Sequence, residues 1–533
     1  KSYEKETKGS RTAVYILSVM AVALLLIGWV NALNLMVARF LERGKEFGVR
    51  KAFGASRKQM LFQGLLEAGI VNTLAAGIAL GWLEVLLPVV YSRAAYDFGA
   101  NTLLLPGFWV AVLSIIALGT FFTGLYPSYL LTRIRPADIM RGKLLHSRKG
   151  NKMRKVLIVV QFVASFILIT GTFVVVAQVR YMENETASAA MKQIVVLKYP
   201  SFTDELSAKM ESFKKQLKQK TYIRQVTVSG AVPGVEVANY FTNRPYGSDQ
   251  SEVKLIQMFA VDYDYLPTYS PDMVCGRAFS EEYGDELNKV VLNEEAVRLL
   301  GFPSNEAALG RQLAMEVVEE PLQVIGVVRN YHQQSLAVPY KPIIFFIKER
   351  VPFIGTPYIS IRMDGTADAA RLAEIEQAYR DFFPTSLFSY FYLDDFNRNQ
   401  YKEDRNFGWM FAGSALLAVF VACLGLWTVT LFSTLSRVKE IGIRKVLGAG
   451  KASLFVVLTR ELLLLTVIAS VIGVPVSAFL MNNWLEGYAF HIGLPWWSYA
   501  VAFVLLMCIA FGTVARQVWR IIRLKPMYIL RSE

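Results

Sequence analysis

Seven apolar stretches, each long enough to cross a bilayer as a helix, limit the folds open to this chain of 533 residues. A helix needs about 20 residues to span the hydrocarbon core of a membrane. The stretches are Val14 to Val37, Leu61 to Val90, Phe108 to Leu131, Val156 to Val179, Phe411 to Phe432, Leu454 to Leu480 and Trp496 to Ile521. With 54% hydrophobic and only 19% charged residues, the chain is too apolar for a soluble domain. We predict an α-helical polytopic membrane protein with seven spans.

The distribution of charge predicts how these spans are oriented. The net charge is +14 at pH 7, yet residues 180–405 contain more acidic than basic residues. The basic excess lies in the loops after the first, third and fifth spans and in the C-terminal tail, which the positive-inside rule assigns to the cytoplasm. Residues 181–405 and the loop 481–495 are then expected on the outer side. Because the basic runs adjoin spans, membrane lipid explains them and no nucleic-acid partner is predicted.

One eleven-residue segment occurs twice, as KEFGVRKAFGA (45–55) and, 394 residues later, as KEIGIRKVLGA (439–449). Seven positions are identical and the other four exchange one apolar residue for another. Each copy lies in a short loop between two spans, where sequence drifts unless something binds there. Apolar residues at i, i+3 and i+4 before a glycine predict a short amphipathic helix with a glycine stop in each loop.

The polar face of each predicted helix is suited to charge-assisted contacts with a partner protein. A helix lying on acidic lipid is the alternative, but the identities between the two copies argue against it. Two such loops in one chain predict two partner subunits. The residues assigned to docking are Lys45, Glu46, Gly48, Arg50, Lys51, Phe53 and Gly54 in the first copy and Lys439, Glu440, Gly442, Arg444, Lys445, Leu447 and Gly448 in the second.

The same offset of 394 residues relates the two halves of the chain. It places Arg11 on Arg405. Near the end of each half, RIRPADIMR (133–141) matches RLKPMYILR (523–531), at an offset of 390 residues. Both halves therefore follow one plan: a span, an outer domain, then three spans. We expect a complete protein to have an eighth span and a further outer domain before Lys1. The predicted domains are a first membrane domain (1–145, docking loop 39–59), a linker and leading span (146–180), an α+β outer domain (181–405) and a second membrane domain (406–533, docking loop 433–452).

These features together resemble a known family. KEIGIRKVLGA after an outer domain and a span, followed by two spans and a Pro-x-x-x-Leu-Arg tail, is similar to the FtsX/MacB-type permeases of ABC transporters. This is the mechanotransmission class that includes LolC/LolE. The outer segments VDYDYLPTYSPDMVCGRAFSEE (261–282), VVLNEEAVRLLG (290–301) and VIGVVRNYHQQSL (324–336) are similar to the MacB-like periplasmic core domain of the two-domain permeases of Bacteroidetes.

The resemblance implies a permease subunit in the bacterial inner membrane, with residues 181–405 in the periplasm. It implies that the two docking segments are coupling helices, which seat in separate ATP-binding subunits. ATP and Mg would be bound by those subunits, and the movement would serve export or extraction of a lipoprotein, peptide or drug. Control of periplasmic cell-wall hydrolases is the alternative output. An adaptor, a lipoprotein or such a hydrolase is then the expected periplasmic partner.

No catalytic chemistry is predicted in this chain. The segment GAGKAS (448–453) fails as a phosphate-binding loop, because Lys445 replaces its first glycine and Ala452 replaces the Ser or Thr that coordinates magnesium. A membrane-anchored periplasmic enzyme is the alternative from another class. The outer segment holds a single histidine, His332, and a single cysteine, Cys275, which cannot form a metal-ligand cluster. We therefore predict no catalytic residue, no metal site and no cofactor.

Two carboxylates inside apolar stretches stand at equivalent places, Glu67 and Glu461, each thirteen residues after the glycine of its docking loop. Membrane carboxylates often mark a path for protons or ions. Their shallow depth instead favours a structural role, in which each pairs with a basic residue of the docking loop. Because the spans contain no chain of ionisable residues, we expect the permease to act by mechanical movement.

Overall fold

The structure is a computed structural model that describes residues 11–43, 46, 49–50, 53–93, 104–125, 127–129, 148–186, 193–200, 206–237, 239–351, 354–365, 368–436, 444, 447 and 449–522. The chain divides into two compact units. The membrane unit comprises Lys1–Ala177, Glu403–Trp484 and Gly493–Glu533, and the extramembrane unit comprises Gln178–Lys402 and Leu485–Ile492. The second unit therefore includes a short segment from the loop 481–495, which lies outside the predicted domain 181–405.

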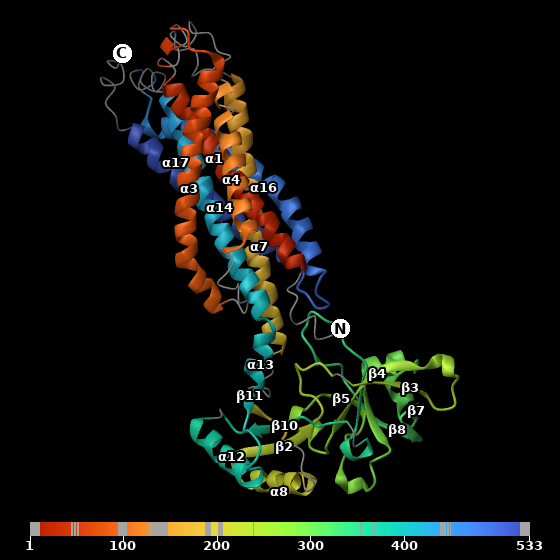
Figure 1. The fold of residues 1–533 in the computed structure, drawn as a ribbon. Coiled ribbons are helices and arrows are strands. Elements are labelled where there is room, and N and C mark those ends of the chain that lie inside the picture. Colours follow the sequence, from red (N-terminus) through yellow and green to blue (C-terminus); the bar gives the residue numbers. More distant parts are fainter. Residues whose placement is uncertain are drawn as a thin grey trace. The chain divides into compact units, whose positions relative to one another are not determined.

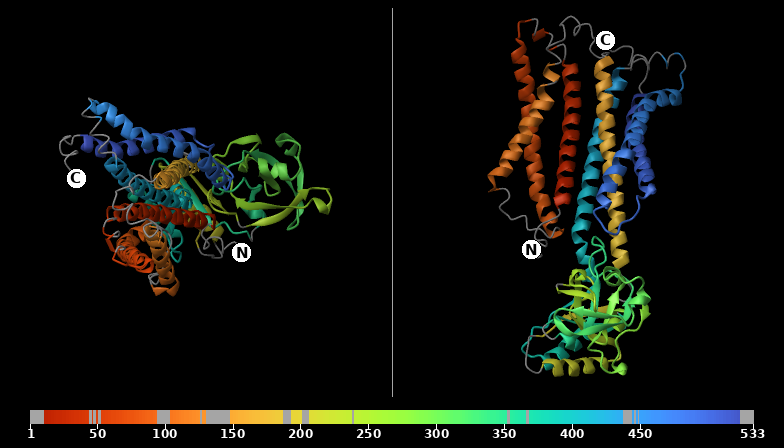
Figure 2. Two further views of the ribbon diagram at one scale, coloured as in Figure 1. Left: turned by 90° about the horizontal axis from the view of Figure 1, so that it is seen from above. Right: turned by 90° about the vertical axis from the view of Figure 1, so that its right-hand side faces the viewer.

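Long helices build the membrane unit (Figure 1). They are α1 (Arg11–Glu42), α3 (Arg57–Arg93), α4 (Pro106–Thr120), which continues into a π-helical turn (Phe121–Leu125), α7 (Arg148–Thr186), α14 (Lys402–Ser436), α16 (Lys451–Leu485) and α17 (Trp496–Ile522). Seven segments of the described chain are long and apolar enough to span a membrane, which confirms the seven predicted spans. Figure 2 shows these helices running alongside one another.

Uncharged polar side chains join the two halves of the membrane unit. Asn31 on α1 donates from Nδ2 to the carbonyl of Val421 on α14, and Gln161 on α7 donates from Nε2 to the carbonyl of Ile27 on α1, each over 3.4 Å. The offset of 394 residues relates Ile27 to Val421, so equivalent carbonyls of the two halves accept these bonds. Hydrogen bonds of this kind hold membrane helices together at about 1 kcal/mol each.

The same crossing requires a glycine on α14. A Cβ atom at Gly425 would lie 2.8 Å from Oε1 of Gln161 and 3.2 Å from Oδ1 of Asn31. Gly425 is the repeat equivalent of Asn31. One half therefore supplies a polar side chain where the other half leaves room for it.

The extramembrane unit contains one eleven-stranded sheet with helices packed on it. The strands are β1 (Ile194–Lys198), β2 (Ile223–Ser229), β3 (Tyr240–Pro245), β4 (Lys254–Val261), β5 (Met273–Gly276), β6 (Lys289–Asn293), β7 (Gln312–Met315), β8 (Val318–Val328), β9 (Ile343–Ile347), β10 (Tyr358–Met363) and β11 (Tyr390–Tyr392). The helices are α8 (Leu206–Lys218), α9 (Tyr265–Tyr269), α10 (Glu294–Leu299), α11 (Asn305–Ala308), α12 (Ala369–Phe382) and α13 (Leu393–Gln400). This arrangement confirms the predicted α+β class.

Two parts can be distinguished in this sheet. In the first, the antiparallel strands run in the order β11-β1-β10-β2, and α8 and α12 pack on them. Helix α8 buries Met210, Phe213 and Leu217, which share one helical face. Asp368 is the N-cap residue of α12, and its carboxylate accepts a hydrogen bond from the backbone N–H of Arg371 at 2.8 Å.

In the second part, the strands β4, β3, β7, β8, β6 and β9 pair in turn, and β9 pairs back to β4. The pairings therefore close into a ring, and β5 adds to it at β8. Apolar side chains from five of these strands pack into one core that includes Ile256, Val290, Leu313, Val324 and Phe346. The two parts of the sheet meet at one residue pair, Ser229 on β2 and Val261 on β4.

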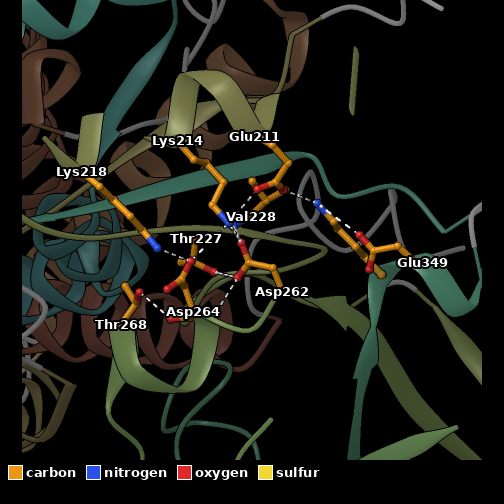
Figure 3. A network of polar contacts seen from close by, with 10 residues as sticks. Glu211, Lys214, Lys218, Thr227, Val228, Asp262, Asp264, Thr268 and Glu349 are labelled. Atoms are coloured by element: carbon orange, nitrogen blue, oxygen red, sulfur yellow. Dashed lines mark hydrogen bonds and ion pairs between the residues drawn. The ribbon is translucent and has the colours of Figure 1, made fainter. Parts of the chain in front are cut away.

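A buried ion pair lies at this junction (Figure 3). Nζ of Lys214 on α8 is 2.7 Å from Oδ2 of Asp262, the residue directly after β4, and 3.2 Å from Oδ2 of Asp264. Asp262 also accepts hydrogen bonds from the hydroxyl of Thr227 and the backbone N–H of Val228, both on β2. Burial opposes the charge of Lys214, but Asp262, together with Glu211 and Asp264, outweighs burial and holds the pKa of Lys214 above its ordinary value. The network ties α8, β2 and the end of β4 together.

Candidate docking site

The first docking loop contains the short helix that its sequence predicts. Glu46, Val49 and Arg50 are helical. The backbone N–H of Phe53 donates to the carbonyl of Val49, and that of Ala55 donates to the carbonyl of Arg50, both at 3.0 Å. Gly54 has a φ of +91°, the left-handed conformation that ends a helix in this way and that glycine adopts without strain. The predicted glycine stop is therefore confirmed in this copy.

The next helix begins directly after this turn. The backbone N–H of Ser56 donates to Oε1 of Gln59 at 2.9 Å, and the N–H of Gln59 donates to Oγ of Ser56 at 3.3 Å. This reciprocal pair is a capping box, which satisfies two N–H groups at the start of α3. The docking helix thus passes into α3 through a short turn whose two ends are fixed by backbone and capping hydrogen bonds.

The second docking loop repeats this backbone pattern at equivalent residues. The N–H of Ala449 donates to the carbonyl of Arg444 at 2.9 Å, as Ala55 does to Arg50. The N–H of Leu454 donates to the carbonyl of Gly450, as that of Met60 does to Ser56, both at 3.2 Å. The other predicted docking residues lie outside the described part of the chain: Lys45, Gly48, Lys51, Lys439, Glu440, Gly442, Lys445 and Gly448.

An apolar side chain is exposed at the end of each docking helix. Phe53 is 89% exposed and Leu447, its repeat equivalent, is 80% exposed. A single exposed apolar residue on a protein surface is ordinary. Here the equivalent positions of both loops carry an exposed apolar side chain, next to the backbone turn that the two copies share. These two side chains are suited to insertion into a pocket on another protein.

The charged residues of the first loop contact one another. Arg50 is 2.7 Å from Oε1 of Glu46 and donates to Oε1 of Gln63 at 2.8 Å. Arg43 is 2.9 Å from Oε2 of Glu46, and this hydrogen bond lowers the pKa of Glu46. Nη1 of Arg43 is also 3.2 Å from Oε1 of Glu67. The loop therefore holds its own polar face in place, and Glu67 anchors it to α3.

Glu461, the repeat equivalent of Glu67, forms an ion pair with Lys155. Lys155 lies on α7, whereas Arg43 lies in the first docking loop. The partner of Glu461 thus comes from the leading span of the second half. The prediction that it would come from the docking loop is wrong for this copy. Both carboxylates stand in ion pairs in this structure, and their structural role stays a prediction.

The two residues weighed for catalysis, His332 and Cys275, belong to the extramembrane unit. Burial lowers the pKa of His332, whose Nε2 is 3.3 Å from the hydroxyl of Tyr340. Burial also raises the pKa of the Cys275 thiol, which makes it a poor nucleophile. Among the described residues, no group of three or more His, Cys, Asp and Glu side chains is placed to hold a metal ion.

Comparison with known proteins identifies both units. The model of the family described as FtsX-like permease C-terminal matches residues 18–136 and again residues 412–526. The two matches begin 394 residues apart, which is the offset of the repeat, and each contains one docking loop. The model of the MacB-like periplasmic core domain matches residues 161–378. This chain is an ABC transporter permease of the FtsX/MacB type.

The permease is similar to several curated proteins. It is 26% identical over 307 residues to the uncharacterized ABC transporter permease YvrN of Bacillus subtilis, a match that covers 53% of this chain and 72% of YvrN. It is 23% identical over 289 residues to the macrolide export ATP-binding/permease protein MacB of Sodalis glossinidius. That match covers 52% of the permease and 44% of the relative, so the permease spans less than half of that protein.

Among solved structures, the permease is similar to the periplasmic region of MacB from Actinobacillus actinomycetemcomitans, with 14% identity and a TM-score of 0.29. This likeness covers 38% of the permease and 90% of the solved chain.

Proposed function

We propose that the permease converts ATP hydrolysis by separate cytoplasmic subunits into movement of its extramembrane unit. The observation that carries this proposal is the pair of docking helices. Each ends in the same backbone turn and leaves one apolar side chain, Phe53 or Leu447, almost fully exposed. Two equivalent surfaces of this kind are suited to two copies of a nucleotide-binding subunit, which would hold the ATP and Mg. The permease itself would be non-catalytic.

The proposed location is the bacterial inner membrane, with the extramembrane unit in the periplasm. The basic loops support this orientation, because they lie next to the ends of spans opposite to residues 181–405. The work done outside would be export or extraction of a lipoprotein, peptide or drug. The MacB relatives support this class of output, because their names describe macrolide export by an ATP-binding/permease protein.

The length and course of helix α14 support mechanical transmission. Helix α14 runs without interruption from Lys402, at the edge of the extramembrane unit, to Ser436 in the second docking loop. Its 35 residues correspond to about 50 Å at 1.5 Å per residue. A displacement of the docking helix would therefore reach the extramembrane unit through a single helix.

Thiol labelling tests the orientation. In a variant with Cys423→Ser and Cys508→Ser, we expect a membrane-impermeant maleimide added to spheroplasts to label Cys275 from the periplasmic side. Because burial raises the pKa of Cys275, labelling should be slow at pH 7 and faster near pH 8.5. Leu387→Cys in a chain without Cys275 is the control, since this position is 86% exposed and should react quickly. Reaction of both thiols only after the membrane is permeabilised would overturn the orientation.

A further inference from the structure

The segment Leu485–Ile492, here called the return segment, joins α16 to α17 but belongs to the extramembrane unit. Its backbone pairs with that unit: the N–H of Phe490 donates to the carbonyl of Leu336 at 3.1 Å, and the N–H of Ala489 donates to the carbonyl of Ala337 at 3.3 Å. Leu336 is fully buried, and its own N–H donates to the hydroxyl of Tyr401 at 3.3 Å. The return segment is therefore seated on a well-packed part of the unit.

An aromatic cluster holds the same segment. The ring of Phe490 lies 4.7 Å from the rings of His332 and Tyr340, measured between centroids. The rings of His332 and Tyr340 are also 4.7 Å apart. Contacts of this kind add about 0.5–1.5 kcal/mol each to simple burial. Three mutually touching rings thus fix the side of the return segment that carries Phe490.

Gln178 on α7 clamps the backbone on both sides of His491. Its Nε2 donates to the carbonyl of Phe490 at 3.0 Å, and its Oε1 accepts from the N–H of Ile492 at 2.9 Å. The Gln178 side chain is fully buried, so both ends of its amide are used. A buried amide that lost these partners would carry the cost of unmade hydrogen bonds. Gln178 is the residue that positions the return segment.

Helix α16 connects this segment to the second docking loop. It runs from Lys451 to Leu485 and is assigned as one helix through Pro475. In the membrane unit, α16 touches α7 where a Cβ atom on Gly473 would lie 2.7 Å from the ring of Phe166. Gln178 and Leu485 each lie twelve residues beyond that contact, about 18 Å along their helices. Helix α7 therefore holds α16 at Gly473 and the segment after it at Gln178.

We propose that the return segment is a second mechanical link between the second docking helix and the extramembrane unit, with Gln178 as its positioning residue. This inference rests on the proposed function. Helix α14 reaches the unit through the covalent chain at Lys402, and α16 reaches it through the return segment. A displacement of the docking helix would thus arrive through two helices. Helix α7 also enters the unit, at Gln178, but among these helices only α14 and α16 adjoin the second docking helix in the chain.

The first test concerns the link itself and needs no ATP-binding subunit. In a chain with all three native cysteines replaced by serine, Ala337→Cys and Ala489→Cys should form a disulfide in isolated membranes under mild oxidation. A backbone N–H that donates directly to a carbonyl places the Cα atoms of the two residues about 5–6 Å apart, within the range that a disulfide spans. Adding Gln178→Leu should slow this cross-link about tenfold, because two buried hydrogen bonds are lost. Absence of the cross-link in the parent would overturn the link, whatever the function.

The second test concerns transmission, with nucleotide-binding subunits bound. In the parent, ATP should change the hydrogen exchange of residues 194–402. Gln178→Leu should keep the subunits and their basal ATPase but lose most of this change. The disulfide formed by Ala337→Cys and Ala489→Cys should restore the ATP-dependent change in the Gln178→Leu chain. A reductant should abolish this restoration. The matched control is Gln161→Leu, a buried amide on the same helix that is outside the link, and it should leave the change intact.

Two results would overturn the inference: an unaltered response in Gln178→Leu, or a disulfide that forms without restoring the response. An equal loss in Gln161→Leu would also overturn it, because loosening of α7 in general would then be the cause. If the parent chain retains no ATP-binding subunits, the proposed function fails. The cross-link still reports whether the return segment is seated, so the two failures are distinguishable.

Discussion

A permease carrying Phe53→Ser and Leu447→Ser should lose its nucleotide-binding subunits on purification while remaining folded in the membrane. Both side chains are exposed in the free permease, at 89% and 80%, so their removal costs the permease itself little packing. Burying each in a partner would contribute about 2 kcal/mol. Losing both should weaken binding by about 4 kcal/mol, roughly a thousandfold. Co-purification from detergent, with the subunits co-expressed, measures this.

Leu387→Ser is the matched control for this double variant. Leu387 is 86% exposed in the extramembrane unit, so the same change there should leave subunit retention intact. Retention of the subunits by the double variant would contradict docking at these loops. A loss that appears only when anionic lipid is removed would favour the lipid-bound helix. Charge reversal at Arg50 is a less direct test, because it also breaks the contacts with Glu46 and Gln63.

Asp262→Ala should destabilise the extramembrane unit by about 3–5 kcal/mol. The side chains of Lys214 and Asp262 are only 8% and 4% exposed, so the variant leaves a buried ammonium without its main partner. The hydrogen bonds from Thr227 and Val228 are lost at the same time. Pulse proteolysis of the full chain in detergent, along a urea series, should show cleavage of this unit at a lower urea concentration.

Two further variants separate the buried pair from a general effect of removing charge. Asp364 forms an ion pair with Arg224, and their side chains are 46% and 59% exposed, respectively. Asp364→Ala should therefore lower the free energy of unfolding by less than about 1 kcal/mol. The double variant Lys214→Met with Asp262→Leu should recover much of the stability lost in Asp262→Ala, because no charge is left buried. An Asp262→Ala chain as resistant as the parent would refute the role given to this network.

The spans and the short helix of the first docking loop were predictable because their signals are local. An apolar run of about 20 residues rarely forms anything but a membrane-spanning helix, and the repeat supplies two independent copies of one loop. In the extramembrane unit, the β-type apolar runs at 194–198, 343–347 and 358–363 are local signals of the same kind, and they coincide with β1, β9 and β10. The similar run at 388–393 predicts a longer strand than the structure contains, because β11 covers only Tyr390–Tyr392 and Leu393 begins α13.

Features that depend on distant partners were missed. The ring of β4, β3, β7, β8, β6 and β9 depends on pairings such as β4 with β9, far apart in the chain, which no local pattern reveals. Asn31 and Gln161 carry no charge, so the pattern of ionisable residues does not reveal them. Nothing local marks the return segment, because its partner Leu336 lies about 150 residues earlier. Likewise, only the packing of α7 brings Lys155 to Glu461.

The backbone turn that closes both docking helices has a consequence for assembly. Since main-chain bonds make the turn, the two loops keep one shape while their tips differ, with an aromatic ring at Phe53 and a branched aliphatic chain at Leu447. If two copies of one ATP-binding subunit occupy both loops, two identical binding pockets would receive different side chains. The assembly would then be asymmetric: the permease would bind one subunit with higher affinity than the other. On dilution of the complex, the more weakly bound subunit would dissociate first.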